Sequence, residues 1–421
     1  MITSLQITTR KFWQKIGQLP RNIWILTLAS FLTDVSTEMI VHLIPLFLAN
    51  VLGVRTITIG LIEGVAETTA SLLKVGSGRL SDWLGRRKWL TVSGYALSTL
   101  VKPFLVLANS WQTVLSVRFF ERMGKGIRTA PRDALIADSI TPQKRGLAFG
   151  LHRAGDTAGA ALGLLLALLV IWRVQGRELT LARTTFHTLV WLSVIPALLA
   201  VIALAGGIHE VKATADKKRR NGGHAPLPPL FKRFLAVVVL FTLGNSSDAF
   251  LVLRAQERGV TILGVMGMLL VFNVVYAAVS GPAGSLSDKI GRQRLLVGGW
   301  LLYALIYLGL ALAQTGGQIV GLVVVYGLYY GLTVGTAKSF VADLVPQAQR
   351  GTAYGWYNGA VGLAALPASL LAGLLWQGVG GWSGLGVQAP FLFGAVMSLA
   401  AVGLLLAWLP QSGEKGLEIR D

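Results

Sequence analysis

The sequence predicts an all-α membrane protein with twelve transmembrane helices in two pseudo-symmetric six-helix bundles. Three observations support this prediction: an apolar composition, apolar stretches that recur along the whole chain, and an internal repeat. Of 421 residues, 53% are hydrophobic and 14% are charged, and the mean hydropathy is +0.62. Soluble proteins average about 25% charged residues. Stretches of about 20 apolar residues can cross a bilayer, and they do so as helices because lipid offers no partner to free backbone groups.

Six apolar spans are expected in each half of the chain. In the first half they cover residues 22–50, 57–79, 89–108, 112–138, 146–172 and 186–206. In the second half they cover residues 233–253, 261–284, 294–313, 317–343, 351–376 and 389–409. The expected organisation is therefore a six-helix bundle in 1–206, a linker in 207–232 and a second six-helix bundle in 233–421.

The linker predicts the orientation of the chain in the membrane. It contains the basic cluster Lys217-Lys218-Arg219-Arg220 and several prolines, a composition typical of a surface connector. Basic loops stay on the cytoplasmic side of a membrane. We therefore expect a cytoplasmic linker and, with an even number of spans, two cytoplasmic termini in a prokaryotic inner membrane.

The net charge of +19 would suggest nucleic-acid binding in a soluble protein. Here the basic residues lie mostly in short loops between apolar spans, as the positive-inside rule requires, so we expect the lipid bilayer as surroundings and no nucleic-acid partner. The sequence has no cysteine. It also has no P-loop, metal-ligand cluster or pairing of a nucleophile with a base. We expect neither a cofactor nor a bound metal, and no enzymatic activity.

An internal repeat relates the two halves. Gly-Arg-Leu-Ser-Asp at 78–82 recurs at an offset of 206 residues as Gly-Ser-Leu-Ser-Asp at 284–288, and both copies continue to a Gly-Arg pair. A second repeat is Ala-Asp at 137–138 and at 342–343, with an Arg-Gly pair that begins seven residues after the Asp in both copies. Two repeats in nearly the same register indicate duplication of a six-helix unit.

These motifs resemble those of the major facilitator superfamily. The loop signature Gly-x-Leu-x-Asp-x-x-Gly-Arg-Lys/Arg of that family matches residues 78–88 closely, and Arg118 and Gly124 resemble its fourth-helix Arg and Gly. The resemblance implies a rocker-switch transporter with a central cavity between two bundles, usually a monomer. The segment 126–134 is similar to a poorly characterised prokaryotic subgroup of multidrug-like permeases.

The repeated motifs predict a gate at the cytoplasmic face, in loops between helices. Asp82 can accept hydrogen bonds from the start of a neighbouring helix, and Arg86 can pair with Asp138. Such contacts would hold the gate shut and break when it opens. The alternative is a tight turn with positive-inside charge. The candidate gate residues are Gly78, Asp82, Gly85, Arg86, Asp138, Arg145, Gly284, Asp288, Arg292, Asp343 and Arg350.

Charged residues inside the spans predict the coupling site, because each costs a few kcal/mol in the membrane and usually marks a pathway. Asp34 and Glu38 follow one another on one stripe of the first helix. We expect them to carry protons and Arg118 to tune them as a neighbouring cation. The alternative is a static network of ion pairs that holds the helices together.

The predicted substrate cavity joins charges of the first half to amide and aromatic groups of the second. Asn245 aligns roughly with Asp34. Each aromatic side chain has the alternative role of packing or of anchoring at the membrane interface. The candidate cavity residues are Glu63, Glu67, His152, Arg153, Asp156, Asn245, Asp248, Tyr330, Trp356 and Asn358.

The leading hypothesis is a secondary transporter that exports a small organic solute in exchange for protons. The glycine spacing in the fifth span resembles that of drug/proton antiporters, but Leu164 stands where their motif has proline. A second hypothesis is a symporter or exchanger of organic anions that uses the Arg-rich fourth and fifth helices. A receptor without transport is a third, opposed by the lack of a sizeable soluble domain.

Overall fold

The computed structural model describes residues 18–84, 86–141, 144–211, 226–346 and 349–409, and these ranges contain helices and no strands. The first half consists of α2 (Arg21–Glu38), η1 (Val41–Leu43), α3 (Ile44–Leu46), η2 (Phe47–Val51), α4 (Thr56–Leu84), α5 (Arg87–Val101), η3 (Lys102–Leu105), α6 (Trp111–Asp138), α7 (Arg145–Val174) and α8 (Arg183–Gly207). The second half consists of α9 (Pro229–Gly244), α10 (Ala249–Glu257), α11 (Ile262–Ile290), α12 (Arg292–Leu312), α13 (Gly316–Asp343), α14 (Arg350–Gln377) and α15 (Ala389–Trp408).

These elements form twelve successive helical runs in the described ranges, and the runs match the spans expected from the sequence. Nine of the described helices are long and apolar enough to cross a membrane by length and composition. The other three runs are α4, α5 with η3, and α6. Of these, α4 and α6 carry the buried charges discussed below, and α5 is short. The charges lower the apolar signal of α4 and α6, whose length is nevertheless that of a membrane span.

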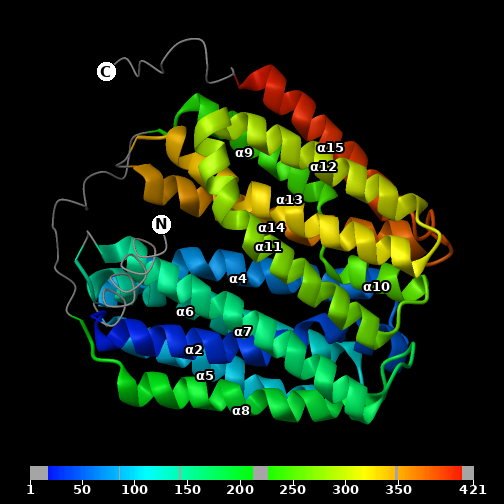
Figure 1. Ribbon diagram of the computed structural model, residues 1–421, viewed down its shortest axis with the longest axis horizontal. Coiled ribbons are helices and arrows are strands. Elements are labelled where there is room, and N and C mark those ends of the chain that lie inside the picture. The colour runs from blue at the N-terminus through cyan, green and yellow to red at the C-terminus, as the bar shows by residue number, and fades with distance from the viewer. Residues whose placement is uncertain (1–17, 85, 142–143, 212–225, 347–348, 410–421) are drawn as a thin grey trace, which may run out of the picture.

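The helices of each half lie side by side, and the two halves meet along α4 with α14 and α7 with α11 (Figure 1). Glycines permit the first of these contacts. A Cβ added to Gly373 would lie 2.5 Å from the Ile57 Cα, and one added to Gly60 would lie 2.1 Å from the Ser369 carbonyl oxygen. The Thr68 hydroxyl donates to the Gly362 carbonyl oxygen over 2.6 Å. Small residues thus let two membrane helices approach closely, as in other membrane bundles.

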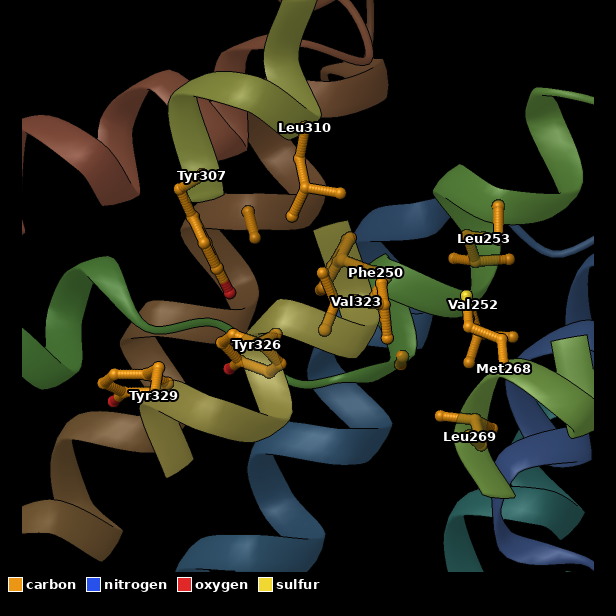
Figure 2. Packing of buried hydrophobic residues seen from close by; sticks show 14 of the residues in the cluster. Phe250, Val252, Leu253, Met268, Leu269, Tyr307, Leu310, Val323, Tyr326 and Tyr329 are labelled. Atoms are coloured by element: carbon orange, nitrogen blue, oxygen red, sulfur yellow. The ribbon is translucent and has the colours of Figure 1, made fainter. Parts of the chain in front are cut away.

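Aromatic packing dominates the interior of the second half. Figure 2 shows Tyr307 of α12 near Tyr326 and Tyr329 of α13, with Val323 and Phe250 beside them. The Tyr307 and Tyr326 ring centroids are 6.1 Å apart, and those of Tyr326 and Tyr329 are 5.3 Å apart. This cluster is largely buried and therefore forms part of the hydrophobic core, to which large aromatic side chains contribute much apolar surface.

The expectation that the Gly-x-Leu-Ser-Asp motifs form loops is wrong, because both lie in the last turns of helices. Residues 78–82 belong to α4, and residues 284–288 belong to α11. In the second half, α11 ends at Ile290 and is followed by Gly291, whose φ of 95° is in the region that favours glycine. Glycine inside a helix lowers helix propensity without ending the helix. We call the end of the molecule at which α4 and α11 terminate the motif end, and the opposite one the far end.

The first and seventh spans are interrupted, whereas the sequence predicted continuous helices there. α2 ends at Glu38 before the short helix η1, and four residues separate the end of α9 at Gly244 from the start of α10 at Ala249. Pro45 lies in the first turn of α3, where its missing N–H prevents a regular continuation. The second break contains Asn245 to Asp248, whose side chains compete for backbone hydrogen bonds; the Ser247 hydroxyl accepts one from the Ala249 N–H over 3.2 Å.

Candidate functional site

The charged side chains of α4 share one face. One stripe of α4 packs on α6 and another packs on α14, and the face between these two stripes carries Glu63, Glu67 and Lys74. Exposed Leu72 lies on the opposite side of the helix, which faces lipid. The charged residues of α6 likewise share the face opposite exposed Phe120. The interior between the two halves is therefore lined by ionisable groups from two adjacent helices.

Arg118 is the most deeply buried cation of this interior, with a fully buried side chain. Its guanidinium donates to the Glu63 carboxylate over 2.8 Å and to the Glu121 carboxylate over 3.0 Å. The expectation that Arg118 would face Asp34 and Glu38 is therefore wrong. Two carboxylates on α4 and α6 already neutralise it, and a buried cation is tolerated in a membrane when it is paired in this way.

The remaining arginines of α6 are also held by protein groups. Arg122 pairs with Glu67 at 3.0 Å, and Arg132 pairs with Asp133 at 2.9 Å. The Arg128 guanidinium lies 4.3 Å from the centre of the Tyr95 ring and donates to the Ser98 hydroxyl. In the same region, the Lys102 ammonium contacts the Ser36 hydroxyl. These contacts knit α2, α4, α5 and α6 into one charged layer.

Asp34 differs from the other carboxylates of the first half. Its carboxylate makes no hydrogen bond or ion pair with a residue of the described ranges. It interacts electrostatically with Asp156 and Glu38 as like charges and with Lys125 and Arg128 as opposite charges. Asp34 of α2 thus interacts with opposite charges on α6 and with like charges on α2 and α7, without a fixed counter-ion among the described residues.

Glu38 and His42 form a pair across the break in the first span, with the His42 Nε2 3.0 Å from a Glu38 carboxylate oxygen. His42 also interacts electrostatically with Asp248 of the second half. The offset between His42 and Asp248 is 206 residues, the same as that of the motif repeat. The rough alignment of Asn245 with Asp34 is therefore replaced by an alignment of Asp248 with His42, in which the helix breaks of the two halves correspond.

The charged cluster of α7 reaches the second half. Asp156 lies 3.8 Å from the His152 Nδ1 and 4.0 Å from the Arg153 guanidinium. His152 is buried, and neither of its ring nitrogens has a hydrogen-bond partner among the described residues. Arg153 is largely exposed, and its guanidinium donates to the Tyr276 hydroxyl over 3.0 Å. α7 and α11 are thus linked by a polar contact in the middle of the molecule.

The polar groups of the second half lie around its helix break. The Tyr326 hydroxyl is 3.4 Å from an oxygen of Asp248 and also 3.4 Å from the Asn245 side-chain oxygen. Tyr330 packs edge-on against Tyr276, with ring centroids 5.9 Å apart. Tyr330 also packs edge-on against Tyr326, with ring centroids 5.1 Å apart, so Asn245, Asp248 and Tyr330 lie in one region of the second half.

Trp356 does not belong to this group. On α14, Gly362 and Gly373 pack on α4, whereas Trp356 lies on the opposite face near exposed Leu363 and is 60% exposed itself. Its place is that of a lipid-facing or interfacial tryptophan. Asn358 lies on the inner side, where its amide donates to the Tyr354 carbonyl oxygen.

The gate motifs form one ion pair in each half. Arg292 of α12 pairs with Asp343 of α13 at 2.6 Å and lies 3.4 Å from Asp288. The corresponding pair in the first half is Arg87 with Asp138, so the expected partner Arg86 is wrong by one residue. Arg86 is exposed and precedes α5. Both pairs join helices of the same half, so they do not bridge the gate.

The remaining gate candidates are Gly78, Gly284 and Arg350, which the structure describes, and three residues that it does not describe in full. The Arg350 guanidinium donates to the Ala342 carbonyl oxygen over 3.2 Å. A Cβ at Gly78 would touch Ala130 at 3.4 Å, whereas one at Gly284 would meet nothing within 4 Å. Gly85 and the side chains of Asp82 and Arg145 lie outside the described residues.

The sequence profile described as Major Facilitator Superfamily matches residues 26–261 and 234–420. An uncharacterised MFS-type transporter of Methanocaldococcus jannaschii is 36% identical over 398 residues, which cover 93% of this chain and 96% of the relative. The multi-drug resistance efflux pump PmrA of Streptococcus pneumoniae is 26% identical over 341 residues, 78% of this chain and 82% of the pump.

Solved structures share the fold. The crystal structure of a D-xylose-proton symporter matches with a TM-score of 0.72 at 14% sequence identity, covering 94% of this chain and 99% of the symporter. At this identity the likeness concerns architecture alone. Together with the matching profile, the repeated motifs and the helical architecture, it gives a definite assignment: the chain belongs to the major facilitator superfamily of membrane transporters.

Proposed function

We propose that the protein exports a small organic solute in exchange for protons, by alternating access between two six-helix bundles. The observation that carries the proton coupling is Asp34, a carboxylate within a membrane span that has no fixed partner among the described residues. Such a group can take up and release a proton as the surrounding charges move. The relative named as an efflux pump supports export over import.

Glu38 and His42 extend this proton site toward the second half. They form a pair across the break of the first span, and His42 interacts with Asp248 beyond it. A movement of one bundle against the other changes the distance between these groups. The relative position of the bundles thereby depends on which of these groups holds a proton. An exchanger requires this dependence, because proton binding must be linked to the conformational change.

The alternation itself is supported by the distribution of contacts between the halves. At the far end the Gln256 amide donates to the Leu179 carbonyl oxygen over 2.8 Å, and Thr56 bonds to Gln377 over 2.9 Å. At the motif end of α14, Gly355 and Gly359 lie on the same stripe as Gly362 but have no heavy atom within 4 Å of an added Cβ. The helices therefore diverge there. We propose that the motif end is cytoplasmic and that this is the inward-facing conformation.

The ion pairs Arg87–Asp138 and Arg292–Asp343 also support alternating access. They do not act as the expected latch between the halves, because each pair lies within one half. Each pair fixes the motif end of its own half. A rocker-switch needs two bundles that move as rigid bodies, and these pairs stiffen both bundles where the loops turn.

Transport by purified protein in proteoliposomes tests the proposal. Cationic, neutral and anionic organic compounds are supplied on one side, and proton movement is followed with a pH-sensitive dye. We expect a transported compound to drive proton movement in the opposite direction, and Asp34→Asn to abolish that movement while exchange of the compound across the membrane persists. Unchanged proton coupling in Asp34→Asn would refute the assignment of Asp34.

A second candidate function is exchange or symport of organic anions. The version based on the arginines of α6 loses support, because Arg118, Arg122 and Arg132 are each paired with a carboxylate. Arg153 on α7 still favours an anion, because its side chain is 66% exposed and its ion pair with Asp156 is long, at 4.0 Å. Uptake that is driven by a counter-anion and insensitive to pH would identify this function.

A further inference from the structure

Three lysines from three helices converge on the interior, between the middle of the molecule and the motif end. Lys74 lies on the charged face of α4, and Lys125 lies on the charged face of α6. Lys338 comes from α13 of the other half and lies away from Asp343, which pairs with Arg292. Lys74 interacts electrostatically with both other lysines, so the three share one charged region across the two halves. We call them the lysine triad.

The ammonium groups of the lysine triad have no protein partner among the described residues. None of the three donates a hydrogen bond or forms an ion pair there. Lys125 and Lys338 are exposed, and Lys74 is partly exposed. The neighbouring arginines behave differently, since each is held by a carboxylate, a hydroxyl or an aromatic ring. The N–H donors of the three ammonium groups are therefore not used by protein acceptors among the described residues.

The surroundings of the triad add positive charge and aromatic surface. Arg153 interacts electrostatically with Lys338 and donates to the Tyr276 hydroxyl. Tyr276 and Tyr330 are partly exposed and pack edge-on. Three acidic groups interact electrostatically with the triad: Glu67 and Asp133 are paired with arginines, and Asp34 interacts with Lys125 from a distance, without an ion pair among the described residues. An organic anion could place its oxyanion at the ammonium groups and pack its apolar or aromatic part against the tyrosine rings.

We propose that the lysine triad binds the negatively charged group of the transported solute, which is a small organic anion carrying a carboxylate or phosphate. This assignment rests on the proposed transport function and names its substrate class. It also explains how binding favours movement. When the halves approach at the motif end, Lys338 comes closer to Lys74 and Lys125, and the repulsion among three like charges opposes closure until an anion neutralises them.

Ligand-induced stabilisation of the purified protein in detergent tests the proposal. The probes are phthalate and phenyl phosphate, with phthalamide and benzyl alcohol as neutral counterparts and benzylamine as the cation. A ligand that binds the folded state raises its thermal stability, and the concentration dependence gives a Kd. We expect stabilisation by at least one anion and none by the neutral counterparts. Comparing phthalate with phenyl phosphate distinguishes carboxylate from phosphate.

Substitutions locate the site. Lys74→Gln, Lys125→Gln and Lys338→Gln should each raise the Kd for the anion about tenfold, because a hydrogen bond to a charged group is lost. The corresponding Lys→Arg variants keep the charge and should retain most of the affinity. Lys289→Gln, at an exposed lysine at the end of α11, removes the same charge outside the triad and should bind as the unmodified protein does. Size-exclusion profiles confirm that each variant is folded.

The outcomes separate this inference from the proposed function. No stabilisation by either anion, equal stabilisation by the neutral counterparts, or an equal loss of affinity in Lys289→Gln would overturn the triad as an anion site. Proton-coupled transport of a neutral or cationic compound, unaffected by the triad substitutions, would overturn it while leaving the transporter intact. Anion binding that depends on the triad, without flux of any compound, would instead refute transport.

Discussion

Arg118 illustrates the chemistry of single residues in this interior. Its side chain is fully buried, and two carboxylates share the neutralisation of its charge, one from α4 and one from α6. Removing one partner of a buried pair is far more costly than the pair is worth, because the remaining charge stays desolvated. The pair Glu67–Arg122 differs in that the Glu67 side chain is 46% exposed.

This contrast predicts different stabilities for two equivalent substitutions. Glu63→Gln should lower the free energy of unfolding by about 3 kcal/mol, since Arg118 keeps only Glu121. Glu67→Gln should lower it by no more than about 1 kcal/mol, as for other exposed pairs. Thermal unfolding in detergent, followed by tryptophan fluorescence, measures both. Equal losses of stability in the two variants would show that burial does not set the energy of these pairs.

At this scale the charged faces of helices were easier to predict from the sequence than the partners of single residues. The charged faces of α4 and α6 follow from helical periodicity alone. The contact between Arg118 and Glu63 joins positions 55 apart in the chain, and only the packing of two helices sets it. The correspondence of His42 with Asp248, in contrast, could have been found by extending the 206-residue register of the motifs to the first span of each half.

The elements show why helix ends were harder to predict than spans. The length of the apolar stretches identified the spans. The helices α4 and α11, however, continue past their apolar stretches through the charged motif residues and end at Leu84 and Ile290. The breaks in the first and seventh spans depend on local backbone chemistry, with Pro45 in one case and the polar run 245–248 in the other. Hydropathy averages over such short segments and cannot resolve them.

The glycine stripe of α14 gives a prediction with an internal control. Gly373→Ala should destabilise the protein by about 1–3 kcal/mol, because the new Cβ would lie 2.5 Å from backbone atoms of α4 and overpacking forces helices apart. Gly359→Ala, on the same helix and the same stripe, has open space around its Cβ and should leave stability unchanged or slightly raised. Thermal unfolding separates the two variants.

Transport assays extend this comparison to the mechanism. If α4 and α14 approach at the motif end during the cycle, Gly359→Ala obstructs that approach and should slow transport several-fold while the fold remains stable. Full transport in Gly359→Ala would mean that these two helices do not close on each other at this position.

At the scale of the whole molecule, the asymmetry between the halves is the main feature that function can use. The first half supplies two lysines of the triad and Asp34, which has no ion-pair partner among the described residues, whereas the second supplies aromatic rings and Lys338. The sequence predicted this division from the counts of charged residues in the spans. It could not predict that the halves contact each other at the far end and diverge at the motif end, because both arrangements bury the same helix faces.

Cross-linking tests whether an anion closes the motif end. The chain has no cysteine, so engineered pairs report without background. Gly150→Cys on α7 and Ser280→Cys on α11 place two thiols on either side of the open region; a Cβ at Gly150 meets nothing within 4 Å, and Ser280 is exposed. Their cross-linking by an oxidant should be slow without ligand and faster with phthalate or phenyl phosphate, whichever binds. Adding Lys338→Gln should speed it without any ligand, since the repulsion within the triad is reduced.

A second pair provides the matched control at the far end. Leu179→Cys and Gln256→Cys replace two residues that are in contact in this conformation, where the Gln256 amide reaches the Leu179 carbonyl oxygen. Alternating access requires the far end to open when the motif end closes, so the same anion should slow cross-linking of this pair. Opposite responses of the two pairs demonstrate a rocking movement, because a general tightening of the protein would speed both. Rates that do not change at either end would show that anion binding and the position of the halves are independent.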